Sequence, residues 1–287
     1  MPSLQSIRRR VASVKNTQKI TKAMKLVSAS KLRRAQERVL TARPYAKKMA
    51  EVLGSLGAYT NREYHPLLQK RTVKQAEIIV LSSDRGLCGS FNVNILRKAL
   101  EQFQTVSASV PNVTFNVIGR KGRDFIRRRA LSIRKEWTGF SDKVKYENAS
   151  EIGKELIAEY LKGTFDEVYL IYGEFKSAIQ TRIVVEKLFP VGDFTPSEGT
   201  IEGSFIYEPE EEEVLEALLP RYIESQIFRG LLESAASEQG SRMMAMDSAS
   251  RNAKEMINKL SLIYNKTRQA AITKELMDIV GGAEALK

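Results

Sequence analysis

The chain has 287 residues, of which 43% are hydrophobic, and it carries a formal net charge of +12. This composition excludes a disordered protein, because so many apolar residues can form a sizeable core. One cysteine and one histidine exclude an intrachain disulfide and a cysteine- or histidine-based metal cluster, so we expect no metal site. No apolar run approaches the roughly 20 residues of a membrane span, and no apolar segment follows the basic start, so we expect a cytoplasmic protein without a secretory signal.

The positive charge is concentrated near the N-terminus. Residues 1–48 carry 14 Lys or Arg and one acid, a net +13, whereas residues 49–220 carry 22 bases and 25 acids, a net −3. The first aromatic residue is Tyr45, so this basic segment has no platform on which the bases of a single strand would stack. Charge alone leaves three interpretations open: a duplex nucleic-acid contact, a solvated surface, or a contact with an acidic protein.

Apolar residues recur three or four positions apart from Leu4 to Val14 and resume, after a polar stretch, from Leu32 to about Ala58 with a gap around Pro44. This pattern predicts one long helix over residues 1–58. Pro44 predicts a bend or a locally loosened turn just before it. Fifty residues of helix extend about 75 Å. The apolar stripe comprises Leu4, Ile7, Val11, Val14, Leu32, Ala35, Val39, Ala46, Met49, Leu53 and Leu56.

The middle of the chain, residues 75–195, alternates predicted strands with predicted helices. Strands are expected at 77–83, 113–119, 165–175 and 181–190, and helices at 92–103, 122–131 and 149–163. This alternation predicts a small, mostly parallel, Rossmann-like α/β domain. Residues 196–209 are expected to link it to the C-terminal part of the chain.

The loop SSDRGLCGSFN (82–92) follows the first predicted strand, where α/β sheets bind their ligands. It matches neither G-x-x-x-x-G-K-[ST] nor G-x-G-x-x-G, so a phosphate site is the weaker interpretation. Cys88 has no histidine near it in the sequence, so we expect a buried structural thiol rather than a nucleophile. A local salt bridge between Asp84 and Arg85 would fix the turn. The structural turn is expected to comprise Asp84, Arg85, Gly86, Cys88 and Gly89.

Residues 210–287 predict a second helix, about 100 Å long, which begins with acidic residues where the helix dipole favours them. Only Pro220, Gly230 and Gly240 interrupt it before Gly281. Its stripe comprises Ala249, Ala253, Met256, Leu260, Ile263, Thr267 and Ala270.

Two helices of this length, one at each end of the chain, predict an antiparallel coiled coil with the α/β domain inserted between its halves. Small residues in ESAASEQGSRMMAMDSASRNAKEM (233–256) would let the two backbones approach closely; they are Ala235, Ala236, Ala245, Ala249 and Ala253. Without the middle segment, the helices alone would fit an all-α bundle equally well.

Four segments closely resemble the γ-subunit family of F-type ATP synthases, of the bacterial type. They are ITKAMKLVSASKLRRAQ (20–36), SSDRGLCGSFN (82–92), ASEQGSRMMAMDSASRNAKEMI (236–257) and YNKTRQAAITKELMDIVGGAEAL (264–286). The resemblance implies a central rotor shaft whose terminal helices enter a ring of three α and three β subunits, while the α/β domain lies beside ε and above the c ring. The shaft would couple ion flow through the c ring to ATP synthesis or hydrolysis on β.

The resemblance also implies partner contacts. Contacts with the β subunit fall on Lys22, Met24, Lys25, Arg268 and Gln269, and contacts with the c ring fall on Phe205, Tyr207 and Glu208. The family often has Tyr where this chain has Phe205, which puts that contact in doubt. Small residues and flexible methionines would give a surface that slides, and the basic helix would face acidic loops of β, so that each rotational position favours a different β conformation.

The resemblance implies a subunit that is not itself an enzyme, with no cofactor, no small-molecule substrate and no nucleic acid bound. It implies a peripheral protein on the cytoplasmic face of the bacterial plasma membrane. The segment 192–209 contains no cysteine pair, which argues against redox control. Two alternatives remain: a basic coiled-coil protein that binds nucleic acid, and a coiled-coil subunit of a secretion ATPase, which would not explain the inserted α/β domain.

Overall fold

The structure is a computed structural model that describes residues 3–59, 65–140, 143–192 and 211–284. These residues divide into two compact units. The first unit is built from residues 1–28 and 243–287, and the second from residues 29–242.

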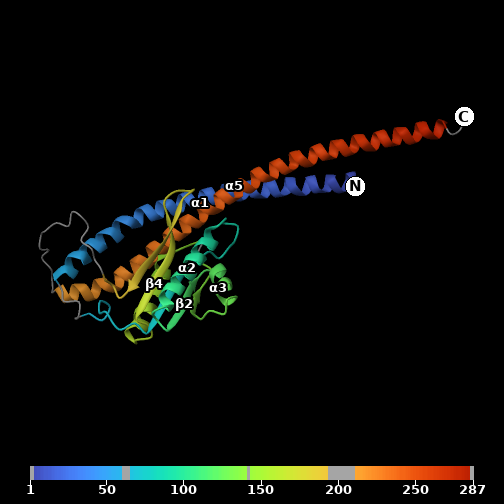
Figure 1. Cartoon of the computed structure of the whole chain (residues 1–287). Helices are drawn as coiled ribbons and strands as arrows, with labels where there is room; N and C mark the ends of the chain where they lie inside the picture. The colour runs from blue at the N-terminus through green and yellow to red at the C-terminus, as the bar shows by residue number, and fades with distance from the viewer. Residues whose placement is uncertain (1–2, 60–64, 141–142, 193–210, 285–287) are drawn as a thin grey trace. The chain divides into compact units, whose positions relative to one another are not determined.

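Two long helices each contribute residues to both units (Figure 1). Helix α1 (Leu4–Tyr59) has 56 residues and α5 (Glu211–Glu284) has 74. The predicted loosening before Pro44 does not interrupt α1, which is helical on both sides of that proline, and α5 likewise contains Pro220. Within the described part of the chain, no helix combines the length and the apolar character that crossing a membrane requires.

In the first unit, the two helices run antiparallel (Figure 1). Buried and partly buried side chains recur seven residues apart along each of them. A seven-residue repeat places one stripe of each helix against its partner in a left-handed coiled coil. The inward side chains are buried or partly buried, and several are small or polar. They are Ile7, Val14, Thr21 and Ser28 on α1, and Met246, Ala253, Leu260 and Thr267 on α5.

The predicted stripe of α5 is half correct in this unit. Ala253, Leu260 and Thr267 face inward, but Met256 and Ile263 are about half exposed, at 47% and 48%. The partly buried residues Ile257, Tyr264 and Ala271 take the second position of the repeat, in place of Met256, Ile263 and Ala270. Residues three and four positions after an inward residue lie on either side of the same seam. The packing of the partner helix decides which of the two is covered.

The second unit contains a five-stranded sheet. Its strands are β1 (Gln75–Leu81), β2 (Asn112–Ile118), β3 (Ile133–Trp137), β4 (Glu167–Phe175) and β5 (Thr181–Phe189). Their order across the sheet is β3-β2-β1-β4-β5. All neighbouring pairs are parallel except β4 with β5, which is antiparallel. The fold class predicted from the sequence is therefore confirmed.

Strand β3 was not predicted. Three of its five residues, Arg134, Lys135 and Glu136, are charged, so it lacks the apolar run that marks the central strands. It forms an edge of the sheet, where a strand needs only one hydrogen-bonded neighbour. Edge position explains why so polar a segment is a strand.

Helices cover both faces of the sheet. Helices α2 (Phe91–Ser107) and α3 (Arg120–Arg127) cover one face, over a core that includes Ile78, Val80, Ile95, Phe115, Val117 and Ile126. Residues 77, 79 and 81 alternate with this core and point to the other face, as the pleat of a strand requires. Helix α4 (Tyr146–Leu161) and α5 approach that second face: Arg134 links Glu77 to Glu155 of α4.

Candidate functional site

The sheet has one position where a ligand would be expected. The chain passes from β1 to β2 and β3 on one side, and then returns to β4 on the other side of β1. In doubly wound sheets, ligands bind outside the carboxyl ends of the strands at this switch point. The loop that follows β1 at Leu81 lies at this switch point, so it is the place where the sequence suggested that a ligand could bind.

Polar groups in this loop are bonded to one another and to α2. The Ser83 amide donates to Asn92 Oδ1 at 3.0 Å, and the Ser83 hydroxyl donates to the Arg85 carbonyl at 2.6 Å. Asn92 Nδ2 also donates to Cys88 Sγ at 3.2 Å. Cys88 is buried, and burial raises the pKa of its thiol, so it remains protonated at neutral pH. These contacts favour the structural interpretation of Cys88.

Asp84 braces the ends of three strands. Its Oδ1 accepts from the Arg120 amide at 3.2 Å, with Arg120 Nε at 3.6 Å, and its Oδ2 accepts from the Gly139 amide at 3.0 Å. Arg120 follows β2 and Gly139 follows β3, so the carboxylate joins the loop after β1 to the ends of β2 and β3. The sequence identified Asp84 as a turn residue, and the structure shows that its carboxylate binds Arg120 and the Gly139 amide.

Helix α5 lies across the crevice itself. Ser234 donates its hydroxyl hydrogen to the Leu81 carbonyl at 3.3 Å, and Ser237 donates to the Gly173 carbonyl at 2.9 Å. Arg242 Nη2 lies 3.3 Å from the carbonyls of both Arg85 and Gly86. The backbone groups at the carboxyl ends of β1 and β4 that would face a ligand are thus bonded to α5.

Little space is left between α5 and the strand ends. A cavity of about 20 Å³ remains among residues that include Ser82, Ile118 and Glu238. That volume is enough for about one water molecule and far too small for a nucleotide. Gly230 permits the close fit, because a Cβ there would lie 3.2 Å from Leu81 Cδ1. The sequence noted Gly230 only as an interruption of the helix.

A three-element clamp lies beside the crevice. Glu233 of α5 accepts from Arg43 Nε at 3.0 Å and from Arg43 Nη2 at 2.9 Å through Oε1, and from the Phe175 amide at 2.9 Å through Oε2. Arg43 Nη2 also donates to the Phe175 carbonyl at 3.2 Å. Glu233 is 3% exposed. Sequence reasoning missed this clamp, and its only sequence signal is an acid preceding a run of small residues on a helix.

A second buried carboxylate of α5 binds α4. Glu224 accepts from the Tyr146 hydroxyl at 2.7 Å and from the Ser150 hydroxyl at 3.0 Å. Gly153 of α4 makes room for it, since a Cβ there would lie 2.9 Å from Glu224 Cγ. Burial, together with the neighbouring Glu224 carboxylate, raises the pKa of Tyr146, so the phenol stays a donor. Sequence analysis did not identify these residues either.

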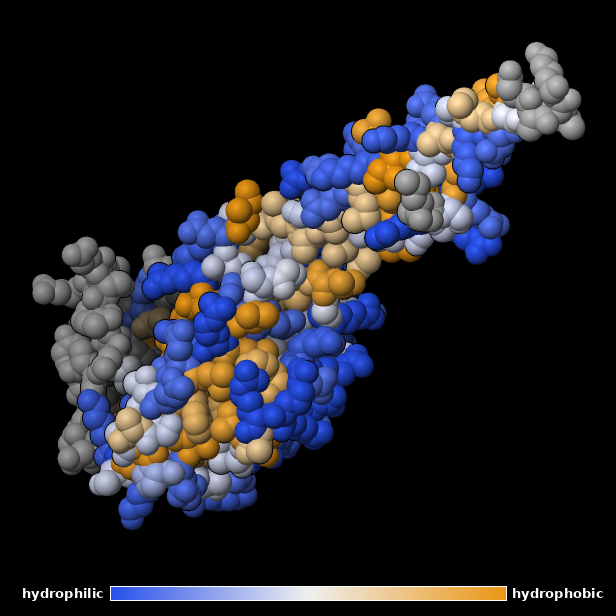
Figure 2. Space-filling model, turned by 45° about the vertical axis from the view of Figure 1, so that its right-hand side comes forward, coloured by the Kyte–Doolittle hydropathy of each residue, from blue (hydrophilic) through white to orange (hydrophobic). Residues whose placement is uncertain are grey.

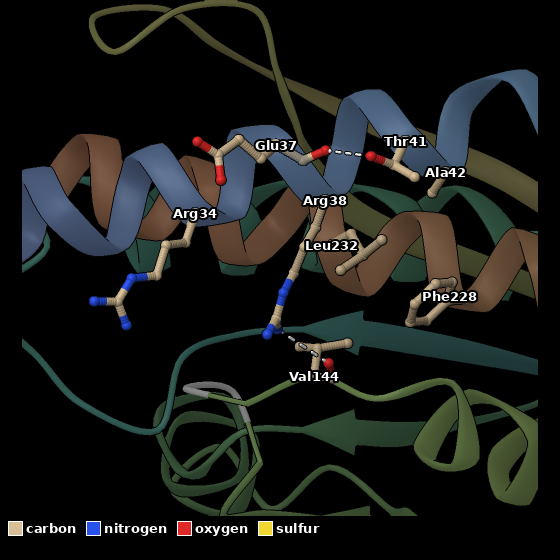
Figure 3. A pocket seen from close by; sticks show the side chains of 8 residues that line it. All are labelled: Arg34, Glu37, Arg38, Thr41, Ala42, Val144, Phe228 and Leu232. Carbon is tan, nitrogen blue, oxygen red and sulfur yellow. Dashed lines mark hydrogen bonds between the residues drawn. The ribbon is translucent and has the colours of Figure 1, made fainter.

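A pocket of about 610 Å³ lies on the basic side of α1 (Figure 3). Arg38 points into it and donates to the Val144 carbonyl at 3.5 Å, whereas Arg34 points away from Arg38. Thr41 donates to the Glu37 carbonyl within α1. These lining groups place no nucleophile beside a base, so the pocket offers no arrangement for covalent catalysis.

The predicted β-subunit contacts all lie in the first unit. Lys22, Arg268 and Gln269 are exposed, and Met24 is partly buried. Lys25 Nζ lies 2.6 Å from Asp247 Oδ1, and this hydrogen bond is the largest cause that lowers the pKa of Asp247. The predicted c-ring contacts, Phe205, Tyr207 and Glu208, lie outside the described residues.

Large apolar side chains are exposed on the helices of this unit. Figure 2 shows such residues interspersed with hydrophilic ones along these helices. Exposed apolar surface of this kind is typical of a surface that a partner protein covers. The residues are Ile20, Leu26, Val27, Met256, Leu262, Ile263, Ile272, Leu276, Met277, Ile279 and Val280.

The chain is similar over its whole length to one family. A family model described as ATP synthase matches residues 3–286. The chain is 50% identical over 290 residues to the ATP synthase gamma chain of Geotalea daltonii, and 46% identical over 287 residues to that of Pelotomaculum thermopropionicum. Each alignment covers 100% of this chain and 100% of the relative.

Solved structures agree with these relatives. The fold is similar to a chain in the central stalk and c-ring structure of Tetrahymena thermophila mitochondrial ATP synthase, with a TM-score of 0.62 at 28% identity, covering 80% of this chain and 99% of that chain. It is also similar to a chain of the Euglena gracilis mitochondrial ATP synthase, with a TM-score of 0.72 at 20% identity, covering 99% and 94%. None of the relatives named here supports the nucleic-acid alternative.

Proposed function

The chain belongs to the ATP synthase gamma-chain family, and from this premise we propose that it is the central rotor shaft of a bacterial F-type ATP synthase. In this role it turns inside a hexamer of three α and three β subunits and couples ion flow through the c ring to ATP synthesis or hydrolysis on β. The observation that carries the proposal is full-length identity of about half to gamma chains, combined with long terminal helices that pair antiparallel.

The first unit is suited to a surface that moves against several partners in turn. Its helix seam mixes short side chains, such as Thr21 and Ala253, with larger ones, such as Met246. Large apolar residues such as Leu262 and Met277 stay exposed. Burying that exposed surface in the hexamer would stabilise the helices, which are otherwise covered only along one seam. Flexible apolar contacts adapt to successive partner conformations.

We propose that Lys22, Met24, Arg268 and Gln269 contact β, and that their exposure or partial burial leaves them available for this. Arg268 presents a planar fork of donors that suits a carboxylate of β. Lys25 has a smaller role in this proposal than the sequence implied, because Asp247 of the same chain already holds its ammonium group at 2.6 Å. Differential contact with the three β subunits then supplies the coupling energy.

The proposed shaft has no catalytic role of its own. Support comes from the switch-point crevice, where α5 bonds to the strand-end carbonyls of Leu81 and Gly173, leaving about 20 Å³. Binding of ATP and its chemistry would belong to the hexamer. We place the assembled subunit at the cytoplasmic face of the plasma membrane, as a peripheral protein that touches ε and, through Phe205, Tyr207 and Glu208, the c ring.

Native mass spectrometry tests the proposal directly. A complex is purified from detergent-solubilised membranes of the source organism through an affinity tag on this chain. The expected mass contains one copy of the chain with three α and three β subunits. Recovery of the chain without the hexamer, or with nucleic acid, would contradict the proposal.

A further inference from the structure

The backbone of Phe175 is held on both sides by the clamp. Phe175 is the last residue of β4, and its amide donates to Glu233 while its carbonyl accepts from Arg43. Glu233 and Arg43 also bind each other through two hydrogen bonds of 3.0 and 2.9 Å. One closed ring of polar contacts therefore joins α1, α5 and the end of a sheet strand.

This ring joins α1 to the sheet, beside apolar packing and beside the hydrogen bonds that Ser234 and Ser237 of α5 make to strand carbonyls. Next to the clamp, β1, β4 and α5 meet through side chains such as Leu81, Leu170 and Leu231, which are buried and apolar. Apolar contacts are non-directional, so they resist separation of two elements more than they resist sliding or rotation of one against the other. Charge-assisted hydrogen bonds are directional, and two N–H groups of Arg43 that converge on Glu233 Oε1 fix orientation as well as distance.

Burial strengthens this directional contact. The Glu233 side chain is 4% exposed, so its bonds to Arg43 and to the Phe175 amide operate with little competition from water. A small rotation of α1 or α5 about its axis would separate these groups and leave a buried carboxylate without its cation. The clamp therefore opposes rotation of either helix relative to the sheet.

We propose that Arg43 and Glu233 are positioning residues that fix the rotational register of α1 and α5 against the sheet, so that torque passes between the helices and the α/β domain through this contact. The inference rests on the proposed function as a rotor shaft. Neither residue touches nucleotide or the reacting atoms in this mechanism. Their effect is on how completely rotation driven in the hexamer reaches the membrane side.

The experiment uses the assembled enzyme in inverted membrane vesicles carrying Arg43→Ala, Glu233→Gln or the conservative variant Arg43→Lys. ATP hydrolysis and ATP-driven ion pumping are measured on the same vesicles, and the amounts of this chain and of β are quantified by immunoblot. Pumping per ATP hydrolysed should fall by about threefold or more in Arg43→Ala and Glu233→Gln, the size expected of a coupling contact. Arg43→Lys should show a smaller loss, since it keeps the charge but not the two guanidinium N–H donors that converge on Glu233 Oε1.

Lys48→Ala is the matched control. It removes a cation from the same helix, but Lys48 is paired with Glu51 at 2.8 Å on an exposed surface, with 77% of its side chain accessible. The ratio of pumping to hydrolysis should not change. An unchanged ratio in fully assembled Arg43→Ala and Glu233→Gln enzymes would overturn the inference.

Failure to assemble would also count against it. If all three clamp variants, including Arg43→Lys, lost the subunit from the vesicles, the clamp would be a folding determinant rather than a positioning contact. Failure of the proposed function gives a different result, because the unaltered chain would then be absent from the hexamer that hydrolyses ATP in these vesicles.

Discussion

The same two helices make different kinds of contact in the two units. In the second unit, α5 buries a series of polar side chains, several of which bond to α1, α4 or the sheet. In the first unit, its buried residues are Met246 and Ala253, and the ion pair of Asp247 with Lys25 is partly exposed. The buried polar residues of α5 in the second unit are Glu224, Ser225, Gln226, Glu233, Ser234, Ser237, Glu238, Gln239 and Arg242.

The two kinds of contact constrain α5 differently. Buried hydrogen bonds are costly to break without replacement, so they specify a single arrangement. Small residues along a helix seam let two helices pack closely, but they do little to fix the rotational position of one helix against the other. The second unit is therefore expected to hold α5 firmly, and the first to hold it lightly, which suits a domain that takes up torque and helices that meet changing partners. Four substitutions test this contrast, each in the purified full-length chain.

Gly119→Ala should have the largest effect. Gly119 has φ of +97°, and a Cβ there would lie 2.3 Å from the Ser82 carbonyl oxygen. Because neither backbone can move without breaking the strand ends, the free energy of unfolding should fall by about 4 kcal/mol or more. Guanidinium unfolding followed by the fluorescence of Trp137, the single tryptophan, measures it.

Gly139→Ala provides the control for backbone strain alone. Gly139 has φ of +96°, but nothing lies within 4 Å of the position of its Cβ. This change should cost about 1 kcal/mol. Equal losses in the two variants would mean that the close approach at Ser82 does not limit the fold.

Arg43→Ala should lower the free energy of unfolding by about 3 kcal/mol, because it leaves the buried Glu233 carboxylate without its cation. We take the lower end of the usual range, since the Arg43 side chain is 44% exposed. The same fluorescence measurement applies, with Lys48→Ala as the control at about 0.5 kcal/mol or less. If Arg43→Ala lowered the free energy of unfolding as little as the control does, the clamp would not be one of the contacts that hold the second unit firmly.

Tyr146→Phe should have a smaller effect, about 1 kcal/mol, because it removes one hydrogen bond to a buried carboxylate and leaves Ser150 as a second donor to Glu224. Tyr45→Phe, at an exposed position of α1, should change the unfolding midpoint by no measurable amount. If the two variants behaved alike, Glu224 would not depend on its phenol partner.

Lys25→Ala should have the smallest effect and lower the unfolding midpoint at neutral pH only slightly, because the ion pair with Asp247 is partly exposed. The pKa of Asp247 is lowered by Lys25, so the unfolded chain binds more protons than the folded chain in the acidic range. The contribution of the pair is therefore present above the ordinary carboxyl pKa and is lost as the pH falls through the lowered value. In the variant, a carbon NMR titration should show the pKa of Asp247 moving up toward its ordinary value. A destabilisation as large as that of Arg43→Ala would show that the first unit is held as firmly as the second.

Periodicity was enough to predict the long helices. The spacing of Ile7, Leu32 and Val39 predicted α1, and α5 was predicted through Gly230 and Gly240 because its pattern resumes after each. The strand β3 escaped prediction because Arg134, Lys135 and Glu136 carry no apolar signal. Arg134 pairs there with the buried Glu77, a contact between residues distant in sequence.

The sequence also indicated the loop after β1 as the place to look for a site, and its resemblance to gamma chains indicated the family. It did not reveal that α5 occupies the crevice. In the sequence, Ser234 and Ser237 resemble ordinary small residues of a helix seam. In the structure, their hydroxyls donate hydrogen bonds to the Leu81 and Gly173 carbonyls. Nothing in the composition of 233–242 separates the two roles.

The sequence by itself determined the features that depend on neighbouring residues: the helix period, the alternation of strands and helices, the placement of charge and the small residues of the C-terminal helix. The tertiary structure alone decided which residues share a contact. Arg43 and Glu233 are 190 residues apart, and each is an ordinary helix residue by propensity. Their pairing depends on where the fold brings the end of β4, because a buried charge is tolerated only where its partners converge.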